Sequence, residues 1–215
     1  MKSTKNPNIN TKNYWNSIYG DDFSRATYAS QGTDHNHIDT AHGPARNEKT
    51  SRFTTALSNV IRGERVLDIG CGVGVFTKLV KDTYPECDVF GTDISDQVIE
   101  ANKRERSDIT YSQGYIGRLD TFPPEYFDVI FCGETIEHLD DPQILFNEAF
   151  SLLKKGGRLI ITTPREDRIN SEEHVWFFEQ EDVEELFIKA GFKKIKFEYL
   201  KDMEHLLIIF AVGTK

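Results

Sequence analysis

The sequence contains no run of about eighteen apolar residues that could span a bilayer, and residues 1–30 lack the apolar core of a secretion signal. Cysteine is scarce: Cys71, Cys87 and Cys132 are odd in number and have no C-x-x-C spacing, which argues against a zinc site and a disulfide framework. These absences predict a soluble, cytoplasmic protein that keeps its thiols reduced and does not contact a membrane.

Positive charge is also in short supply. The 215 residues include 26 Lys and Arg against 35 Asp and Glu, so the formal net charge is −9 and the pI is near 5.2. A broad nucleic-acid surface needs clustered basic side chains to neutralise phosphates, so the composition disfavours a nucleic-acid partner. The chain is long enough to bury one sizeable core, and it shows no internal repeat or low-complexity segment.

A short apolar run ends at Asp68 and is followed by three alternating glycines, Gly70, Gly72 and Gly74. This pattern predicts a buried strand that enters a turn of the size of a phosphate or a nucleoside. The dinucleotide fingerprint requires a further glycine where Val75 stands, so the pattern fails that test. In addition, the Asp68 carboxylate would repel a pyrophosphate but would attract an ammonium or lie near a sulfonium.

A second acid, Asp93, closes the next predicted strand, nineteen residues after Gly74. A carboxylate at this position can accept hydrogen bonds from both hydroxyls of a ribose. A nucleoside that carries positive charge therefore fits the two acids and the glycine turn better than NAD does.

In order and spacing, residues 68–74, Asp93 and residues 127–130 resemble the motifs of the class I S-adenosylmethionine-dependent methyltransferases, over roughly residues 50–213. The resemblance implies a methyltransferase enzyme with S-adenosyl-L-methionine as its cofactor. The cofactor-binding residues that it implies are Asp68, Gly70, Gly72, Gly74, Asp93, Ile94, Gln113 and Gly133. Where the family usually places an acid for the adenine amine, this chain has residues 114–117, so a backbone group, Gln113 or Asp120 is left for that contact.

Alternating strand and helix patterns predict an α/β fold. We expect a Rossmann-like, seven-stranded, mostly parallel sheet with helices on both faces and an antiparallel C-terminal hairpin. The predicted strands are 65–68, 88–92, 109–113, 127–132, 158–162, 193–200 and 205–212. The predicted helices are 46–61, 75–83, 96–106, 141–152 and 179–190, with Ser95 as an N-cap, a stop at residues 154–157 and Gly191 after the last helix.

Residues 1–49 are expected to form an N-terminal arm, and residues 50–215 the domain that binds the cofactor. Three aromatic residues within 14–19 are too apolar to stay exposed, so this segment either completes the core as a helix or covers the substrate. Three histidines lie within 35–42, but the Gly, Pro and Asn around them favour a solvated loop, or a loop that contacts substrate, over a metal site.

Two carboxylates and an imidazole follow the fourth predicted strand. If Glu134 begins a helical turn, Glu137 and His138 lie on the same face as Glu134 by the i, i+3, i+4 rule. The next strand ends at the same edge of the sheet, and the loop after it carries His174. We therefore expect Glu134, His138 and His174 to be catalytic residues beside the methyl group of the cofactor.

The E-x-x-E-H pattern with a later histidine resembles two metal-dependent groups, the ubiquinone-biosynthesis O-methyltransferases and the enzymes that methylate the terminal 2′-hydroxyl of small RNAs. The resemblance implies Mg²⁺, Mn²⁺ or Fe²⁺ held by Glu134, Glu137, His138 and His174. Such an ion would chelate two neighbouring oxygens of the acceptor and lower the pKa of one. A metal-free alternative stays open, in which Glu134 caps a helix and His138 is a general base or satisfies a buried contact.

Further charged and aromatic side chains are expected at the same edge. Arg165 and Arg168 are candidate clamps for a carboxylate or phosphate of the substrate, or solvated loop charges. Residues 176–178 are more typical of lid and core than of a stacking platform. The function that these patterns favour is methyl transfer to an oxygen of a small-molecule acceptor. The alternatives are a metal-independent N-methyltransferase, an RNA 2′-O-methyltransferase and a non-catalytic module that binds the cofactor; the sequence indicates neither the acceptor nor the oligomeric state.

Overall fold

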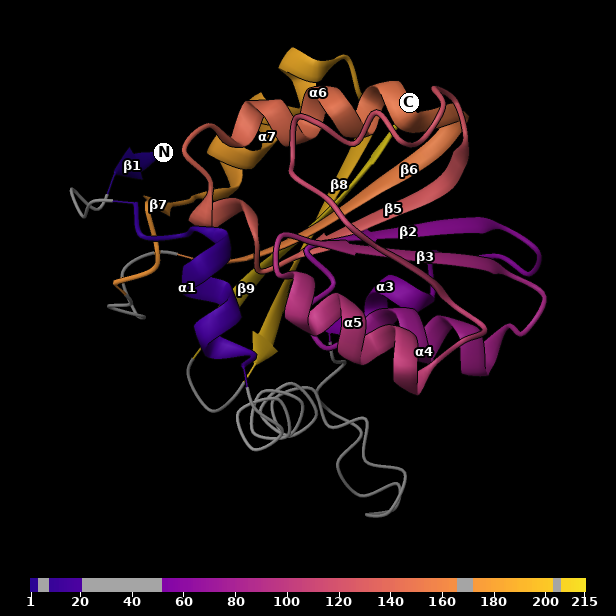
Figure 1. The fold of residues 1–215 in the computed structure, drawn as a ribbon. Coiled ribbons are helices and arrows are strands. Elements are labelled where there is room, and N and C mark those ends of the chain that lie inside the picture. Colours follow the sequence, from indigo (N-terminus) through magenta and orange to yellow (C-terminus); the bar gives the residue numbers. More distant parts are fainter. Residues whose placement is uncertain (4–7, 21–51, 166–171, 203–205) are drawn as a thin grey trace, which may run out of the picture.

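The computed structural model of the chain describes residues 1–3, 8–20, 52–165, 172–202 and 206–215 (Figure 1). Its main sheet has seven strands in the order β4-β3-β2-β5-β6-β9-β8. The strands are β2 (Arg65–Ile69), β3 (Asp88–Asp93), β4 (Thr110–Gln113), β5 (Phe127–Gly133), β6 (Leu153–Pro164), β8 (Lys193–Asp202) and β9 (Leu206–Thr214). The first five strands pair in parallel, and β9 pairs antiparallel with β6 and β8. The expected fold class is confirmed.

Helices cover both faces of this sheet, with α3, α4 and α5 on one face and α6 and α7 on the other (Figure 1). Their bounds are α3 (Arg52–Leu57), α4 (Val75–Thr83), α5 (Asp96–Glu105), α6 (Pro142–Leu152) and α7 (Gln180–Ala190). Side chains alternate along each strand, so Val66 packs with Phe76 of α4, whereas Leu67 packs with Phe146 of α6. The sheet is therefore buried on both sides, as parallel sheets usually are.

Local signals in the sequence explain where three of these helices begin or end. The Ser95 hydroxyl accepts from the backbone N–H of Val98 at the start of α5, and the Asp141 carboxylate caps α6 directly before a proline. Glu179 and the third residue of α7 form a capping box, and Gly191 ends that helix in the left-handed conformation. These four features satisfy backbone groups that a helix leaves unpaired at its ends.

The largest difference from a predicted strand boundary lies at the junction of α6 and β6. Residues 154–157 were expected to end a helix before a strand at 158–162, but α6 ends at Leu152 and β6 begins at the next residue. The Lys154 ammonium lies 2.7 and 2.8 Å from the two carboxylate oxygens of Asp128 on the neighbouring strand β5. The register shifts between Phe127 and Val129, so the extra residues are absorbed as an irregularity within the strand.

The N-terminal segment contains a two-stranded element and a short helix. β1 (Lys2–Ser3) pairs antiparallel with β7 (Trp176–Phe177), and α1 (Lys12–Ile18) is capped by the Thr11 hydroxyl. Of the helix predicted over 46–61, residues 46–51 lie outside the described residues, and the predicted end is wrong because α3 ends at Leu57. There the backbone N–H groups of Asn59 and Val60 donate to carbonyls three residues back, which tightens the chain into a turn. In the described part of the chain, no helix is both long and apolar enough to cross a membrane.

Candidate functional site

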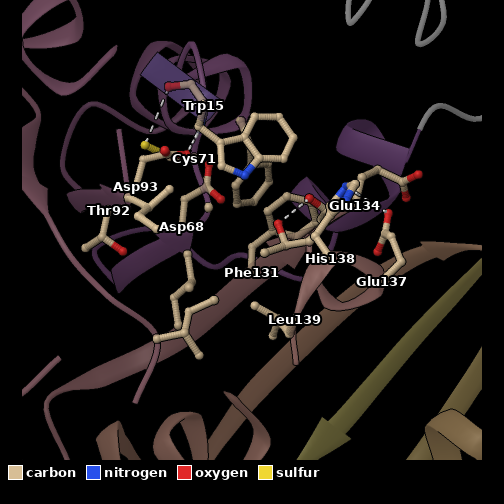
Figure 2. Close-up of a pocket in the computed structure, with 18 of the residues that line it drawn as sticks. Trp15, Asp68, Cys71, Thr92, Asp93, Phe131, Glu134, Glu137, His138 and Leu139 are labelled. Atoms are coloured by element: carbon tan, nitrogen blue, oxygen red, sulfur yellow. Dashed lines mark hydrogen bonds and ion pairs between the residues drawn. The ribbon is translucent and has the colours of Figure 1, made fainter. Parts of the chain in front are cut away.

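A cavity of about 590 Å³ lies at the carboxyl ends of β2, β3 and β5. Trp15 and Tyr19, from α1 and its C-cap, line it from the N-terminal segment. Figure 2 shows Asp68 and Asp93 on one side of this cavity and Glu137 and His138 on the other. This position at the end of a parallel sheet is the usual ligand site of such folds.

The turn after β2 needs glycine because of its backbone angles and its close neighbours. Gly70 has φ +74°, and a Cβ on it would lie 2.5 Å from the Thr135 hydroxyl oxygen. Gly74 has φ +76°, and a Cβ there would lie 2.6 Å from the Tyr111 hydroxyl. Gly72 also has positive φ, +49°. Any other residue at these positions would be strained and would displace a neighbour.

Hydrogen bonds to neighbouring segments hold the turn in place. The backbone N–H groups of Gly70 and Cys71 both donate to the carbonyl oxygen of Thr92, at 2.8 and 2.9 Å. The side-chain amide of Asn102 donates to the carbonyl oxygen of Gly72 at 2.8 Å. The turn is therefore held by hydrogen bonds of the protein itself, and such support reduces the entropy that ligand binding costs.

Asp93 is 8% exposed, and its carboxylate ties the turn to the next helix. One oxygen accepts from the backbone N–H of Gly72 at 3.0 Å, and the other from that of Ser95 at 2.9 Å. Each oxygen keeps a second lone pair, so hydroxyl donors of a ligand can still be accepted. Burial raises the pKa of Asp93, and these backbone hydrogen bonds oppose that rise.

Asp68 is 3% exposed and lines the cavity, and no described residue donates a hydrogen bond to its carboxylate. Burial, and then the negative charge of Asp93, raise the pKa of Asp68 well above its usual range. A buried carboxylate without a cation is costly, so a positively charged ligand group in this half of the cavity would be stabilising. The expectation that Asp68 attracts an ammonium or sulfonium stays a prediction.

The other predicted cofactor residues divide between the cavity wall and the surface. Ile94 and Gly133 line the cavity together with Asp68, Asp93, Gly70 and Gly72, whereas Gly74 shapes the turn and is not part of the lining. Gln113 does not: its side chain is exposed and donates to the carbonyl oxygen of Ile94 at 2.9 Å. Residues 114–116 line the cavity in its place, which leaves a backbone group there as the candidate adenine contact; Asp120 is not part of the lining.

The segment after β5 does not form the helical face expected from Glu134 onward. Glu134 has φ +49°, and the turn that follows is a single 3₁₀ turn, η2 (Ile136–His138). A residue in the left-handed region cannot continue a right-handed helical turn, so Glu134 does not share a helical face with Glu137 and His138. Its carboxylate lies 3.8 Å from the Arg52 guanidinium.

Three of the four predicted metal ligands do come together. One ligand atom from each of Glu137, His138 and His174 lies within 4.8 Å of the others, and the two imidazole rings are 5.0 Å apart. Glu137 Oε1 is 3.9 Å from His138 Nε2, while Glu137 Oε2 accepts from the Thr163 hydroxyl at 3.0 Å. Glu134 does not belong to this group, so its role as a ligand stays a prediction.

Burial keeps both imidazoles of this group neutral. It lowers the pKa of His138, and it lowers the pKa of His174 to about 4, with the proximity of His138 as a smaller cause. His138 Nδ1 lies 3.0 Å from the carbonyl oxygen of Glu173. A carbonyl only accepts hydrogen bonds, so Nδ1 carries the proton and Nε2 carries the lone pair.

Glu137 is 1% exposed, and burial raises its pKa to about 7. Its Oε1 is buried and has no hydrogen-bond partner among the described residues. The group offers one unsatisfied carboxylate oxygen and two neutral imidazole nitrogens. Divalent transition metals bind imidazole nitrogen well, whereas Mg²⁺ prefers carboxylate oxygen. The group Glu137, His138 and His174 therefore fits a divalent cation.

Several contacts in this half of the cavity escaped sequence reasoning. Trp15 packs edge-on against the His138 ring, with centroids 5.3 Å apart, and stacks on Tyr19. Asn10 and Arg52 also line the cavity. The aromatic cluster at 14–19 did indicate that this segment docks, but nothing in the sequence marked Asn10, which lies in a stretch that reads as a disordered lead.

The remaining predictions lie elsewhere or outside the described residues. Arg165 does not line the cavity; it donates to the Glu179 carboxylate at 2.8 Å and lies over the Tyr199 ring. Arg168 and the three histidines within 35–42 fall outside the described residues. Phe178 is buried in the core, and Trp176 Nε1 donates to the carbonyl oxygen of Leu139.

Comparisons with known proteins agree with this geometry. Residues 43–196 match the model of a family described as a methyltransferase domain. The malonyl-[acyl-carrier protein] O-methyltransferase 1 of Ilyobacter polytropus is 30% identical over 99 residues, which cover 46% of this chain and 37% of that protein. The ubiquinone biosynthesis O-methyltransferase of Proteus mirabilis is 29% identical over 119 residues, 54% of this chain and 46% of that protein. The match spans less than half the length of either curated relative.

Among solved structures, phosphoethanolamine N-methyltransferase 2 of Haemonchus contortus, in complex with S-adenosyl-L-methionine, superimposes with a TM-score of 0.73. The superposition covers 96% of this chain and 60% of that chain at 17% sequence identity, so it shows a shared fold. Together the comparisons confirm the resemblance to class I S-adenosylmethionine-dependent methyltransferases that the motifs predicted.

Proposed function

The chain belongs to the methyltransferase domain family, and on that premise we propose that it binds S-adenosylmethionine in the cavity and transfers the methyl group to an oxygen of a small-molecule acceptor. The proposal is supported by the O-methyltransferase names of the two curated relatives and by the composition of the cavity wall. The proposed substrate class rests on the chemistry of two parts of the cavity: the part with Asp68, the glycine turn and Asp93, and the part with Glu137, His138 and His174.

The glycine turn and the two buried aspartates hold the methyl donor in this proposal. The ammonium of its amino-acid part lies beside Asp68, where it offsets the buried negative charge. The ribose hydroxyls donate to the lone pairs of Asp93 that the backbone leaves open. Arg52 is the one permanently cationic side chain among the described residues that line the cavity, and it suits the carboxylate of the donor.

Glu137, His138 and His174 serve the acceptor. As the acceptor oxygen attacks the methyl carbon, the new C–O bond forms while the S–CH₃ bond breaks, and the bonding electron pair stays on sulfur to give S-adenosylhomocysteine. The hydroxyl proton passes to His138 Nε2, which is a neutral base because burial lowers the pKa of His138. Nitrogen acceptors need less help of this kind, because a neutral amine already has a nucleophilic lone pair.

A divalent cation would supply Lewis-acid polarisation of the acceptor oxygen and so lower its pKa. Glu137, His138 and His174 would hold it, and the unsatisfied Oε1 of Glu137 supports this assignment. His138 Nε2 has one lone pair, so His138 is either a ligand or a base at a given moment. Removal of the ion with a chelator distinguishes the metal-assisted mode from the general-base mode.

The observation that carries the proposal is the neutral, partly buried His138 whose Nε2 faces Glu137, in the same cavity as the glycine turn. The proposal is tested by incubating the full chain and S-adenosylmethionine with a panel of small phenols and vicinal diols and measuring the release of S-adenosylhomocysteine. Calorimetry measures the affinity for S-adenosylhomocysteine in parallel. We expect His138→Ala to lower kcat by about 100- to 10,000-fold while that affinity stays unchanged.

A chelator followed by Mg²⁺ or Mn²⁺ completes the test. Loss of activity that returns with the ion supports the metal mode, and full activity in chelator supports the base mode. Failure to bind S-adenosylhomocysteine, or full activity of His138→Ala on every oxygen acceptor, would overturn the proposal.

A further inference from the structure

The carbonyl oxygen of Glu173 connects the N-terminal segment to the imidazole of His138. It accepts a hydrogen bond from His138 Nδ1 at 3.0 Å and a second from the side-chain amide of Asn10 at 2.7 Å. A carbonyl oxygen has two lone pairs, so these two donors use its full capacity. Asn10 and His138 thus meet at one backbone atom although they are far apart in the sequence.

The orientation of the Asn10 amide is fixed by its partners. Its nitrogen donates to Glu173 and to the side-chain oxygen of Asn8, the latter at 2.9 Å, and both partners are acceptors. A flipped amide would place oxygen against two oxygens and lose both bonds. The Asn8 amide in turn donates to the Asp140 carboxylate at 2.8 Å, so the arrangement is anchored beyond η2 as well.

Further hydrogen bonds attach the segment that carries Glu173 to η2 and to the N-terminal arm. On its C-terminal side, the backbone N–H of Val175 donates to the carbonyl oxygen of Glu137 at 2.7 Å. On the side of the N-terminal arm, the Tyr14 hydroxyl bonds to the Glu173 carboxylate. The Glu173 carbonyl oxygen accepts from His138 Nδ1 and from the Asn10 amide, so the arm supplies one of these two hydrogen bonds.

We propose that Asn10 is a positioning residue, whose hydrogen bond holds the Glu173 carbonyl where it keeps the proton of His138 on Nδ1 and the Nε2 lone pair toward the cavity. The inference rests on the proposed function, because it assigns to the arm a part in the same methyl transfer. The arm then does more than cover the cavity: the catalytic imidazole adopts its working tautomer and orientation when residues 8–14 are docked.

The chain offers a matched control. Asn16, on α1, also attaches the arm to the domain: its amide donates to the Asp96 carboxylate at 2.9 Å, and its oxygen accepts from the Ser95 hydroxyl at 2.7 Å. Its side chain makes no hydrogen bond with Glu173 or His138, so Asn16→Ala loosens the arm without removing the positioning bond. Asn10→Asp is the second variant, since aspartate has the same size but cannot donate to a carbonyl.

We expect Asn10→Ala and Asn10→Asp to lower kcat by about tenfold, the effect of one lost hydrogen bond, with the KM for the methyl donor within about twofold. Asn16→Ala should raise the KM for the methyl donor and leave kcat within about twofold of the wild-type value. Equal loss of kcat in the Asn10 and Asn16 variants would mean that arm docking alone matters, and it would overturn the inference.

The tautomer gives a readout that does not depend on turnover. In full-length protein labelled with ¹⁵N-histidine, with His138 assigned by its loss in His138→Ala, long-range ¹H–¹⁵N correlations report which ring nitrogen bears the proton. We expect His138 to be the Nδ1–H form in the wild type and in Asn16→Ala, and a mixture of tautomers in both Asn10 variants. An unchanged tautomer in the Asn10 variants overturns the inference, whether or not methyl transfer is found, whereas loss of S-adenosylhomocysteine binding in the wild type would count against the proposed function alone.

Discussion

The two halves of the cavity are built by different means. The donor half, formed by Asp68, residues 70–74 and Asp93, comes from two neighbouring strands and is held by backbone hydrogen bonds. The acceptor half, formed by residues 134–138, residues 173–174 and the arm at 8–19, is assembled from distant segments through side chains. Local backbone geometry determines the first half, and tertiary contacts determine the second.

This difference is consistent with the demands on each half. A fixed methyl donor suits a preformed cradle whose shape repeats in every turnover. In the proposed reaction an acceptor enters, loses a proton and leaves, and in this half Glu137 Oε1 is buried with no hydrogen-bond partner among the described residues. Such groups reduce stability and are retained where function needs them. The predictions below test this contrast, beginning with the largest effect.

Glu137→Gln should stabilise the protein at pH 8 in the presence of a chelator, by up to about 3 kcal/mol in the free energy of unfolding. Burial raises the folded-state pKa of Glu137 to about 7, above the ordinary value of 4.5. The buried carboxyl therefore favours the native state at low pH, and this contribution is lost as the pH rises through 7. A glutamine carries no charge and avoids the loss.

Urea unfolding at pH 5 and pH 8 checks this prediction. At pH 5 the difference between the variant and the wild type should shrink below about 1 kcal/mol, because Glu137 is then protonated in the native state. Glu86→Gln, on an exposed carboxylate that pairs with Arg62, is the control and should change stability little at either pH. Equal stability of Glu137→Gln and wild type at pH 8 would mean that the carboxylate is solvated and that the acceptor half is not strained.

In the donor half, Asp93→Ala should weaken S-adenosylhomocysteine binding by about 30-fold, which corresponds to about 2 kcal/mol for hydrogen bonds to a charged group. The variant loses the acceptor for the ribose and the two backbone contacts that fix the turn. Asp88→Ala is the matched control, because Asp88 begins the same strand at its exposed end and pairs with Arg65. If calorimetry found comparable losses of S-adenosylhomocysteine affinity for both variants, Asp93 would not be a ligand-binding residue.

The fold and the donor half could be predicted because their signals are local. Each glycine of the turn is required because its own φ is positive, and Asp93 ends β3, which pairs directly with β2. The acceptor half could be predicted in part: Glu137, His138 and His174 meet because β5 and β6 are adjacent. The left-handed backbone angle of Glu134 could not be predicted from the E-x-x-E-H spacing, and the contact of Asn10 depends on a long-range docking that no local pattern records.

The smallest expected effect concerns Gln113. The sequence predicted it as a cofactor-binding residue, but in the structure it does not line the cavity. Gln113 pairs with Asp93 across the β3–β4 ladder, yet its side chain is exposed and bonds to the Ile94 carbonyl instead of lining the cavity. Gln113→Ala should therefore leave S-adenosylhomocysteine affinity within about twofold, since a single exposed hydrogen bond contributes little. Ile116→Ala, which removes apolar surface from the cavity wall, should weaken binding more. The reverse order in calorimetry would show that the glutamine amide, and not the backbone of residues 114–116, contacts the ligand, and the donor half would then include one side chain that the backbone does not fix.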